Sequence, residues 1–429
     1  MRIIILNQFF YPDHSATSQL MTELAESLVE RGVEVTALAG RGRYNGGERL
    51  SPRESVHGVR IERAWSTSFG KRSTVGRVSD YLSFYLGASW KMLRLPRHEL
   101  VMALTTPPLI GLVALVVGRL RGLRVVMLVQ DVYPDIAIAL GALSARNPVT
   151  RFIDWISRRT LKRADRIVVL SQCMRDRIAG KVGAERASRI DVIHNWADGS
   201  DIRPLVKDEP NPFAEEHNLG SSFVVLFSGN LGRVNEFTTV LEAALLLRGR
   251  PDIVFVFVGE GAKTREIEEF SQRHKLRNVH LLPYQPRADL RYSLAAGHAL
   301  LVTLAGELAG LSVPSKAYAI MAAGRPILFV GDARSETARI IEEHRCGAVV
   351  GSGDGGRLAN IIEEWAADRP RLDDMGRAAR ALFEDRFDRP RAVEAYVQSF
   401  EKCMSAVESP ATDSVARESK ADREAEANL

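Results

Sequence analysis

The chain has 429 residues, too many for one ordinary hydrophobic core, so two domains are expected. Its apolar share of 45% and charged share of 26% are typical of a globular protein, and its net charge of +5 comes without a nucleic-acid-binding motif. The three cysteines, Cys173, Cys346 and Cys403, are too widely spaced for a disulfide framework or a metal set, which excludes a disulfide-stapled scaffold and predicts a reducing compartment.

Apolar strands and helices alternate through the first half of the sequence. The first strand is expected at 2–6, and a helix at 19–31 carries Leu20, Leu24 and Leu28 on one stripe. Further β-rich runs lie at 35–38, 59–63, 100–104, 124–129, 166–170 and 191–193. Strands separated by helices predict a parallel sheet that is covered on both faces.

Neither the N-terminus nor the uncharged run 100–118 fits a membrane or export segment. The apolar start at 1–6 is too short and too early for a signal peptide. Pro107 and Pro108 divide the uncharged run into a strand and a helix of about ten residues, which is too short to span a bilayer. No transmembrane segment is expected, and the expected location is the cytoplasm.

A polar stretch at 197–215 is expected to link two domains. The alternation then restarts, with strands at 223–227, 253–258, 279–282, 299–303, 327–330 and 348–350. The predicted fold is α/β, with Rossmann-like domains at 1–200 and 201–387 that face each other across a ligand-binding cleft. A helix at 388–406 is expected to cross back to the first domain, and the polar tail 407–429 is expected to be disordered.

The loop after the first strand carries small hydroxyl residues that are candidates for the acceptor side of a site. Tyr11, Ser15 and Thr17 lie between that strand and the following helix, where they could hold a sugar or a phosphate. The alternative is an ordinary loop in which Ser15 or Ser18 caps the helix.

Asp131 follows the strand at 124–129 and is a candidate catalytic carboxylate. A carboxylate just past a strand end faces the cleft, where it can bind hydroxyls or stabilise a developing cation. The alternative is an Asx turn before Pro134. Asp131 is preferred to Asp135 for this role.

Glycine-rich turns end the first two strands of the second domain. Gly229, Asn230 and Gly232 allow the backbone to approach a ligand, and Arg233 offers a fork for diphosphate oxygens. The alternative is a plain turn with an exposed arginine. Glu260 lies in the second turn, which lacks the third glycine of a dinucleotide fingerprint.

The loop that closes the following strand contains Pro283 and Tyr284. It could stack on or pair with a nucleobase. A plain turn bounded by prolines is the equally weighted alternative.

The most informative stretch is 313–326, a short apolar helix with a lysine in its first turn. Pro314 and Ser315 are expected to start the helix, with the serine oxygen capping free N–H groups, and Gly324 to end it. Lys316 would then lie beside a phosphate bound at the helix start. The alternative is a core helix with a surface lysine.

The sequence lacks the signatures of a hydrolase triad and of a metal site. His194 closes the first domain, and a lone histidine there is more often structural than catalytic. The sequence shows no Ser-His-Asp order, no His-x-x-x-His pair and no Asp-x-Asp pattern, so neither a metal nor a cofactor is expected.

Six motifs, taken in this order, resemble the family 4 glycosyltransferases of the GT-B fold, and especially the WbuB/WcaI-like subgroup of bacterial polysaccharide enzymes. They are Phe10-Tyr-Pro, Asp131-Val-Tyr-Pro, Asn195-Trp-Ala-Asp, Ser228-Gly-Asn-Leu-Gly, Val258-Gly-Glu-Gly, and Pro314-Ser-Lys with Met321-Ala-Ala-Gly-Arg-Pro. The resemblance extends from residue 7 to about residue 406. Each motif is weak alone, but the set in this order is specific.

The resemblance implies transfer of a hexosyl group from a UDP- or GDP-linked sugar, with retention of anomeric configuration and without a metal. The second domain would hold the donor and the first domain the acceptor. Arg233 and Lys316 would bear the charge of the departing diphosphate, which agrees with the need for fixed cations at a developing anion. The loop at Pro283 and Tyr284 would hold the base.

Two departures from the family pattern affect donor binding. The family often has two glutamates in this region, at the positions of Leu311 and Ala319, and the second usually holds the ribose hydroxyls. Asn235 stands where a lysine is common. Loss of the ribose contact could weaken donor binding by roughly 1–3 kcal/mol if polar groups are left unpaired. Glu307, Glu336 or a backbone group could compensate.

These observations predict a glycosyltransferase of cell-surface glycan synthesis that acts on a lipid-linked or polysaccharide acceptor. The basic amphipathic segments 150–163 and 72–97 fit an anionic membrane surface at the inner face, although packing on the sheet is the alternative. Two other functions stay open, a nucleotide-sugar 2-epimerase and a degenerate partner subunit that binds the sugar nucleotide. Ala319 is the reason for the second.

Overall fold

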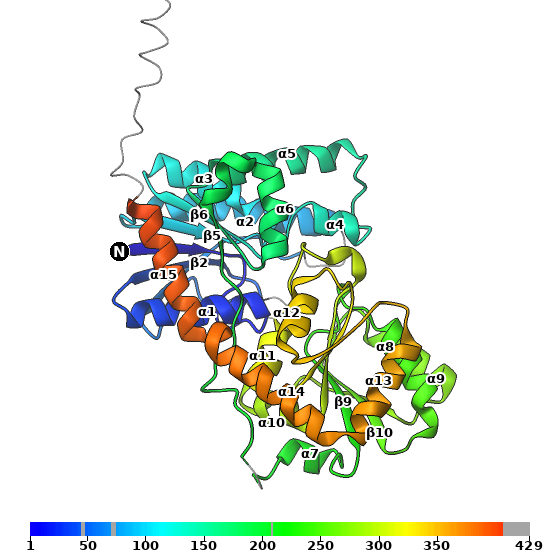
Figure 1. The fold of residues 1–429 in the computed structure, drawn as a ribbon. Coiled ribbons are helices and arrows are strands. Elements are labelled where there is room, and N and C mark those ends of the chain that lie inside the picture. The colour runs from blue at the N-terminus through cyan, green and yellow to red at the C-terminus, as the bar shows by residue number, and fades with distance from the viewer. Residues whose placement is uncertain (44–47, 70–73, 207–208, 406–429) are drawn as a thin grey trace, which may run out of the picture.

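The structure is a computed structural model that describes residues 1–43, 48–69, 74–206 and 209–405. Two α/β domains lie one above the other in Figure 1, each built on its own sheet. The predicted pair of Rossmann-like domains is confirmed. The tail expected at 407–429 and the first residues of the segment 72–97 lie outside the described residues.

The first sheet has the strand order β3-β4-β2-β1-β5-β6-β7-β8. All neighbours are parallel except β3 and β4. The strands are β1 (Arg2–Leu6), β2 (Glu34–Gly40), β3 (Arg53–Val56), β4 (Val59–Ala64), β5 (Leu100–Ala103), β6 (Arg124–Val129), β7 (Arg166–Val169) and β8 (Ile190–Val192). The helices are α1 (Ala16–Glu30), α2 (Thr74–Arg94), α3 (Ile110–Leu120), α4 (Asp135–Ala139), α5 (Pro148–Arg163) and α6 (Gln172–Val182).

The second sheet is parallel, with the order β11-β10-β9-β12-β13-β14. Its strands are β9 (Phe223–Ser228), β10 (Ile253–Val258), β11 (Val279–Leu282), β12 (Ala299–Thr303), β13 (Ile327–Val330) and β14 (Gly347–Val350). The helices are α7 (Pro212–Glu216), α8 (Thr238–Leu246), α9 (Thr264–His274), α10 (Leu290–Ala296), α11 (Lys316–Ala322), α12 (Glu336–His344), α13 (Gly355–Ala367), α14 (Arg369–Leu382) and α15 (Arg389–Ser405).

The strand order reverses once in each sheet, and these two points position the candidate site. In the first sheet the chain moves outward from β1 to one side and from β5 to the other. In the second sheet the same reversal separates β9 from β12. Loops at the carboxyl ends of the strands on either side of such a point diverge and leave room for a ligand.

The uncharged run 100–118 divides as predicted into a strand, β5, and a helix, α3. Between them, Pro107 and Pro108 lie outside regular structure. No helix in the described part of the chain is both long enough and apolar enough to cross a membrane.

The C-terminal helix α15 lies against the first domain. Figure 1 shows α14 and α15 running diagonally from the second domain to the first. The Tyr396 ring packs edge-on against Trp196 with 6.0 Å between centroids, and the Ser399 hydroxyl donates to Asp191 over 2.7 Å. Ala197 and Asp388 form a bridge between the linker and the start of α15.

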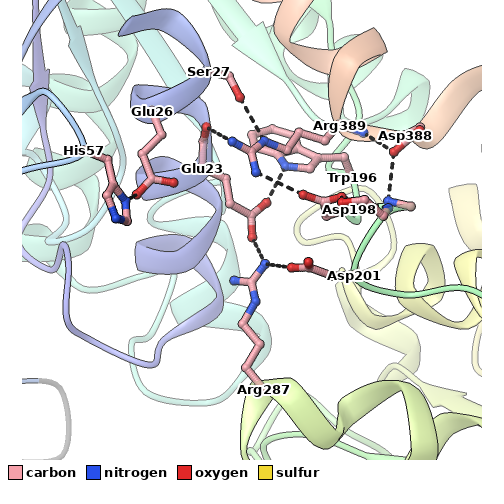
Figure 2. A network of polar contacts seen from close by, with 12 residues as sticks. Glu23, Glu26, Ser27, His57, Trp196, Asp198, Asp201, Arg287, Asp388 and Arg389 are labelled. Carbon is pink, nitrogen blue, oxygen red and sulfur yellow. Dashed lines mark hydrogen bonds and ion pairs between the residues drawn. The ribbon is translucent and has the colours of Figure 1, made fainter. Parts of the chain in front are cut away.

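A polar network joins the two domains beside α1 (Figure 2). Glu23 is buried in α1 and accepts hydrogen bonds from the Trp196 indole, over 2.8 Å, and from Arg287 of the second domain. Arg389 donates to the Ser27 hydroxyl over 2.8 Å and pairs with Asp198 over 3.0 Å. The network ties α1, the linker and α15 to the second domain.

Candidate active site

Lys316 lies beneath the loop that follows β9. Its ammonium nitrogen is 3.6 Å from the centre of the Phe227 ring and 3.4 Å from the Asn235 side-chain oxygen. A Cβ added at Gly229 would be 3.9 Å from the same nitrogen. Burial lowers the pKa of Lys316 to about 7. The lysine is therefore aimed at the strand-order reversal of the second sheet, and it is not a freely solvated surface residue.

The start of α11 differs from the expected helix start. Pro314 and Ser315 precede the first helical residue, Lys316, and the Ser315 hydroxyl caps no N–H group. Backbone bonds from Ala317 to Pro314 and from Tyr318 to Ser315 span three residues, so a tighter turn replaces the expected cap. Gly324 ends the helix as predicted, with a φ of 63°.

The two glycine turns are packed against each other. Gly229 and Gly259 have φ values of 128° and 130°, a region that side chains disfavour. A Cβ on Gly259 would lie 2.2 Å from the carbonyl oxygen of Gly229, and one on Gly261 would lie 2.4 Å from that of Leu231. The N–H of Gly229 donates to the carbonyl of Val258. Glycine is thus required here by close backbone contact between the loops after β9 and β10.

Asn235 holds the loop after β9 in place through side-chain hydrogen bonds, a role that the sequence analysis did not predict. Its side-chain nitrogen donates to the carbonyls of Asn230 and Gly232 over 3.0 and 3.2 Å. Its oxygen accepts from Thr303 at the end of β12 and from Lys316. One buried amide therefore links the glycine turn to the lysine. The departure from the family pattern, which often has a lysine at this position, is the only signal that pointed here.

The other predicted donor-side residues lie at the same end of the second sheet but are open to solvent. Arg233 and Glu260 are exposed, and Tyr284 is 52% exposed beside the exposed Pro283. Within the described residues, Arg233 makes no ion pair or side-chain hydrogen bond. The structure therefore places these side chains around the glycine turns without bringing them into contact with Lys316.

Asp131 lies against the loop that leads into α11. The Thr105 hydroxyl accepts from the backbone N–H of Asp131, and the Ser312 hydroxyl bonds to the carboxylate. Burial raises the pKa of Asp131, partly offset by the Ser312 bond. The N–H of Val132 donates to the carbonyl of Leu311 over 3.0 Å. The first domain thus presents Asp131 directly to the second.

Asp135 is engaged in ion pairs instead. Its carboxylate pairs with Lys181 and with Arg177, both on α6. Asp135 is thus occupied by contacts within the first domain, and the choice of Asp131 as the functional carboxylate stays a prediction.

A small cavity lies next to Asp131, beneath α3 and α5. Its lining includes Leu109 and Gly111 at the start of α3, and Ser157 and Thr160 of α5. Most of the remaining lining is aliphatic, and Asp131 supplies the charged group. The cavity and Thr105 and Ser312 were missed by sequence reasoning, because they depend on which loops meet in space.

The acceptor-side loop after β1 has polar atoms that lack partners. Tyr11 is exposed, Thr17 is half-buried, and the Ser15 hydroxyl neither caps α1 nor finds another partner among the described residues. The side-chain oxygen of Asn7 and the side-chain nitrogen of Gln130 are also buried and unpaired within the described residues. These atoms lie at the carboxyl ends of β1 and β6, where a polar ligand could satisfy them.

The two residues suggested as compensation for Ala319 are placed differently. Glu307 is exposed beyond β12. The Glu336 carboxylate lies 3.5 Å from the Cys173 sulfur of the first domain and 3.8 Å from Arg339. Ala319 itself is half-buried and packs on the core.

The lone histidine of the first domain has a packing role. Burial lowers the pKa of His194, and its ring packs edge-on against Phe387 with 5.2 Å between centroids. Among the described residues, no three His, Cys, Asp or Glu side chains are grouped so that they could hold a metal ion.

Two family models match the chain in succession. The glycosyl transferase 4-like domain matches residues 16–196, and the glycosyl transferases group 1 model matches residues 209–382. A probable glycosyltransferase, WbjE of Pseudomonas aeruginosa, is 28% identical over 312 residues, 73% of this chain and 76% of the relative. The putative colanic acid biosynthesis glycosyl transferase WcaI of Escherichia coli (strain K12) is 24% identical over 357 residues, 80% of this chain and 86% of the relative.

Solved structures share the fold over nearly the whole chain. Sucrose-phosphate synthase from Thermosynechococcus elongatus has a TM-score of 0.77 at 15% identity, covering 95% of this chain and 100% of its own. Anabaena HepE in complex with UDP-glucose has a TM-score of 0.70 at 17% identity, covering 94% of this chain and 100% of its own. Together with the two parallel-sheet domains, these likenesses establish the GT-B fold.

Proposed function

Because this chain belongs to the glycosyltransferases of polysaccharide synthesis that join a 4-like domain to a group 1 domain, we propose that it is a retaining, metal-independent enzyme. The donor is a nucleoside-diphosphate sugar held by the second domain. The acceptor is a lipid-linked or polysaccharide hydroxyl held by the first domain. In the reaction the bond between C1 of the sugar and the diphosphate oxygen breaks, and a bond from C1 to the acceptor oxygen forms on the same face. The proton of the acceptor hydroxyl passes to the departing diphosphate.

The position of Lys316 carries this proposal. The leaving diphosphate takes the bonding electron pair, so a fixed cation at that oxygen lowers the barrier. Lys316 lies between the glycine turn after β9 and the loop after β12, where the strand order reverses. Arg233, exposed on the same turn, supplies a second cation. HepE, which shares the fold, is solved with UDP-glucose, and this supports the same donor class.

Asp131 is the carboxylate proposed for the sugar side of the reaction. It lies beside Ser312, three residues before Ser315. From there it can accept a hydrogen bond from a sugar or acceptor hydroxyl, or stabilise the positive charge that develops at C1. The unpaired atoms of Asn7, Ser15 and Gln130 add hydrogen-bonding capacity on the acceptor side.

The test replaces Lys316 with methionine, which keeps the length and removes the charge. We expect Lys316→Met to lower turnover of the best donor from a UDP- and GDP-sugar panel by about 10²–10³-fold, with a nearly unchanged melting temperature. Lys402→Met, on the exposed side of α15, is the matched control and keeps full activity.

A fully active Lys316→Met variant would reject the leaving-group role. The panel also separates the rival function, since a degenerate partner subunit, suggested by Ala319, binds a sugar nucleotide without transferring or hydrolysing it. Retention is checked by the anomeric configuration of the product in NMR spectra.

A further inference from the structure

Helix α2 is apolar on two opposite sides, and the sheet explains only one of them. Phe84, Ala88 and Met92 are buried against the first domain. The opposite side carries an exposed stripe at helical spacing that consists of Val75, Val78, Leu82, Leu86, Trp90 and Leu93. Leu86 is 73% exposed and Trp90 is 58% exposed. The alternative interpretation, that the segment 72–97 packs on the sheet, accounts for the buried side of α2 but not for this stripe.

Helices α3 and α5 continue the exposed apolar surface. α3 contacts both α2 and α5, and all three lie in the upper part of the first domain in Figure 1. Leu112, Val116 and Leu120 are exposed at four-residue spacing on α3. On α5, Val149, Phe152 and Trp155 are exposed, and the last two rings stack with 5.9 Å between centroids. We call these residues, with the α2 stripe, the α2–α3–α5 face.

Positive charge surrounds this face. The guanidinium carbon of Arg94 lies 3.7 Å from the Trp90 ring centre, and that of Arg159 lies 5.3 Å from the Trp155 ring centre. On α5 the exposed side of the helix that carries Phe152 also carries exposed Arg159, Lys162 and Arg163 toward its C-terminal end. Acidic groups are few: α3 has none, α2 has Asp80 and α5 has Asp154. Asp154 is neutralised by Arg158 and Lys181, and Asp80 bonds to Thr67.

From this combination we infer that the α2–α3–α5 face docks on an anionic lipid bilayer. Large exposed apolar patches mark interaction sites, and aromatic side chains with basic neighbours suit the boundary between head groups and acyl chains. Each Lys or Arg near an anionic surface adds electrostatic attraction. A second copy of this chain would bring the same cations together, so charge favours lipid over self-association.

Docking through this face also indicates what kind of acceptor the enzyme uses. This second step rests on the proposed function. The inner sides of α3 and α5 line the cavity beside Asp131, while their outer sides belong to the face. A bilayer held there lies within two helix diameters of the Asp131 carboxylate, roughly 20 Å. The acceptor is therefore a hydroxyl of a glycan carried on a lipid in that bilayer.

The experiment measures binding of the 429-residue chain to vesicles without any donor. We expect it to float with vesicles of phosphatidylcholine and phosphatidylglycerol, to bind pure phosphatidylcholine much more weakly, and to lose binding as salt rises. Leu86→Ser with Phe152→Ser should weaken binding about tenfold or more, because both exposed side chains leave the interface. Leu246→Ser, at an apolar residue 62% exposed on α8 of the second domain, is the matched control.

Three outcomes would overturn the proposal. They are failure of the wild-type protein to bind anionic vesicles, wild-type binding by the Leu86→Ser/Phe152→Ser variant, and a dimer in analytical ultracentrifugation that this variant abolishes. Unchanged binding of UDP by the variant, measured in parallel, supports a defect confined to membrane docking. If the Leu86→Ser/Phe152→Ser variant loses vesicle binding but still hydrolyses the donor, both proposals are supported. If the wild-type protein binds vesicles but binds no sugar nucleotide, the proposed function alone is rejected.

Discussion

At the scale of single residues, the site depends on an amide that holds a lysine. Asn235 accepts from Lys316 and donates to two carbonyls of the glycine turn, so the position of the lysine nitrogen is fixed before any ligand arrives. The Phe227 ring beneath the ammonium group adds a favourable contact while it excludes water. Such preorganisation lowers the cost of rearrangement when the diphosphate departs.

Ala319 offers a gain-of-function prediction at the same scale. Since the family usually has a ribose-binding glutamate there, we expect Ala319→Glu to tighten donor binding by about 1–2 kcal/mol. Calorimetric titration with UDP and its 2′-deoxy analogue is the measurement. Equal gains for both ligands, or no gain for either, would show that the ribose is held by other groups.

At the scale of elements, the loops after β9 and β10 function as one packed unit. Gly259→Ala would add a Cβ 2.2 Å from the Gly229 carbonyl oxygen at a φ of 130°. We expect a loss of about 2–4 kcal/mol in the free energy of unfolding, together with weakened donor binding.

Gly249→Ala is the control for this change, since nothing lies within 4 Å of the added Cβ. Its effect in urea denaturation should stay within about 0.5 kcal/mol. Equal stability of the two variants would contradict the packed arrangement of the turns.

Most strands could be predicted from the sequence within one or two residues, because strands buried on both faces are continuous apolar runs. The edge strand β3 was missed, because its residues Arg53–Val56 include two charged side chains and none of the four is buried. The contacts of Asn235 could not be predicted, because they require two loops distant in sequence to meet. The segment 72–97 was predicted to be amphipathic, but only the packing shows which side of α2 is covered and which is exposed.

At the scale of the whole molecule, the relative position of the domains depends on the network beside α1. Glu23→Gln keeps an acceptor for Trp196 and removes the charge opposite Arg287. We expect it to lower the free energy of unfolding by about 1–3 kcal/mol in chemical denaturation.

Glu26→Gln is the matched control for this prediction, because Glu26 pairs with the exposed His57 inside the first domain. Its cost should stay below about 0.5 kcal/mol. Equal losses of unfolding free energy in the two variants would contradict a contribution of the network to domain contact. The same holds if Glu23→Gln costs as much in a protein that already carries Arg287→Met as it does in the wild type.

The central claim, that Lys316 bears the charge of the leaving diphosphate, is tested most directly by proton uptake on UDP binding. Burial lowers the pKa of the free lysine to about 7, so at pH 8 it is mostly neutral. A bound diphosphate raises that pKa, and binding must then draw a proton from solution. Calorimetry in buffers of different ionisation enthalpy should show uptake of nearly one proton at pH 8 and much less at pH 6. Lys316→Met should show none, and equal uptake by both proteins, or uptake by neither, would contradict the account.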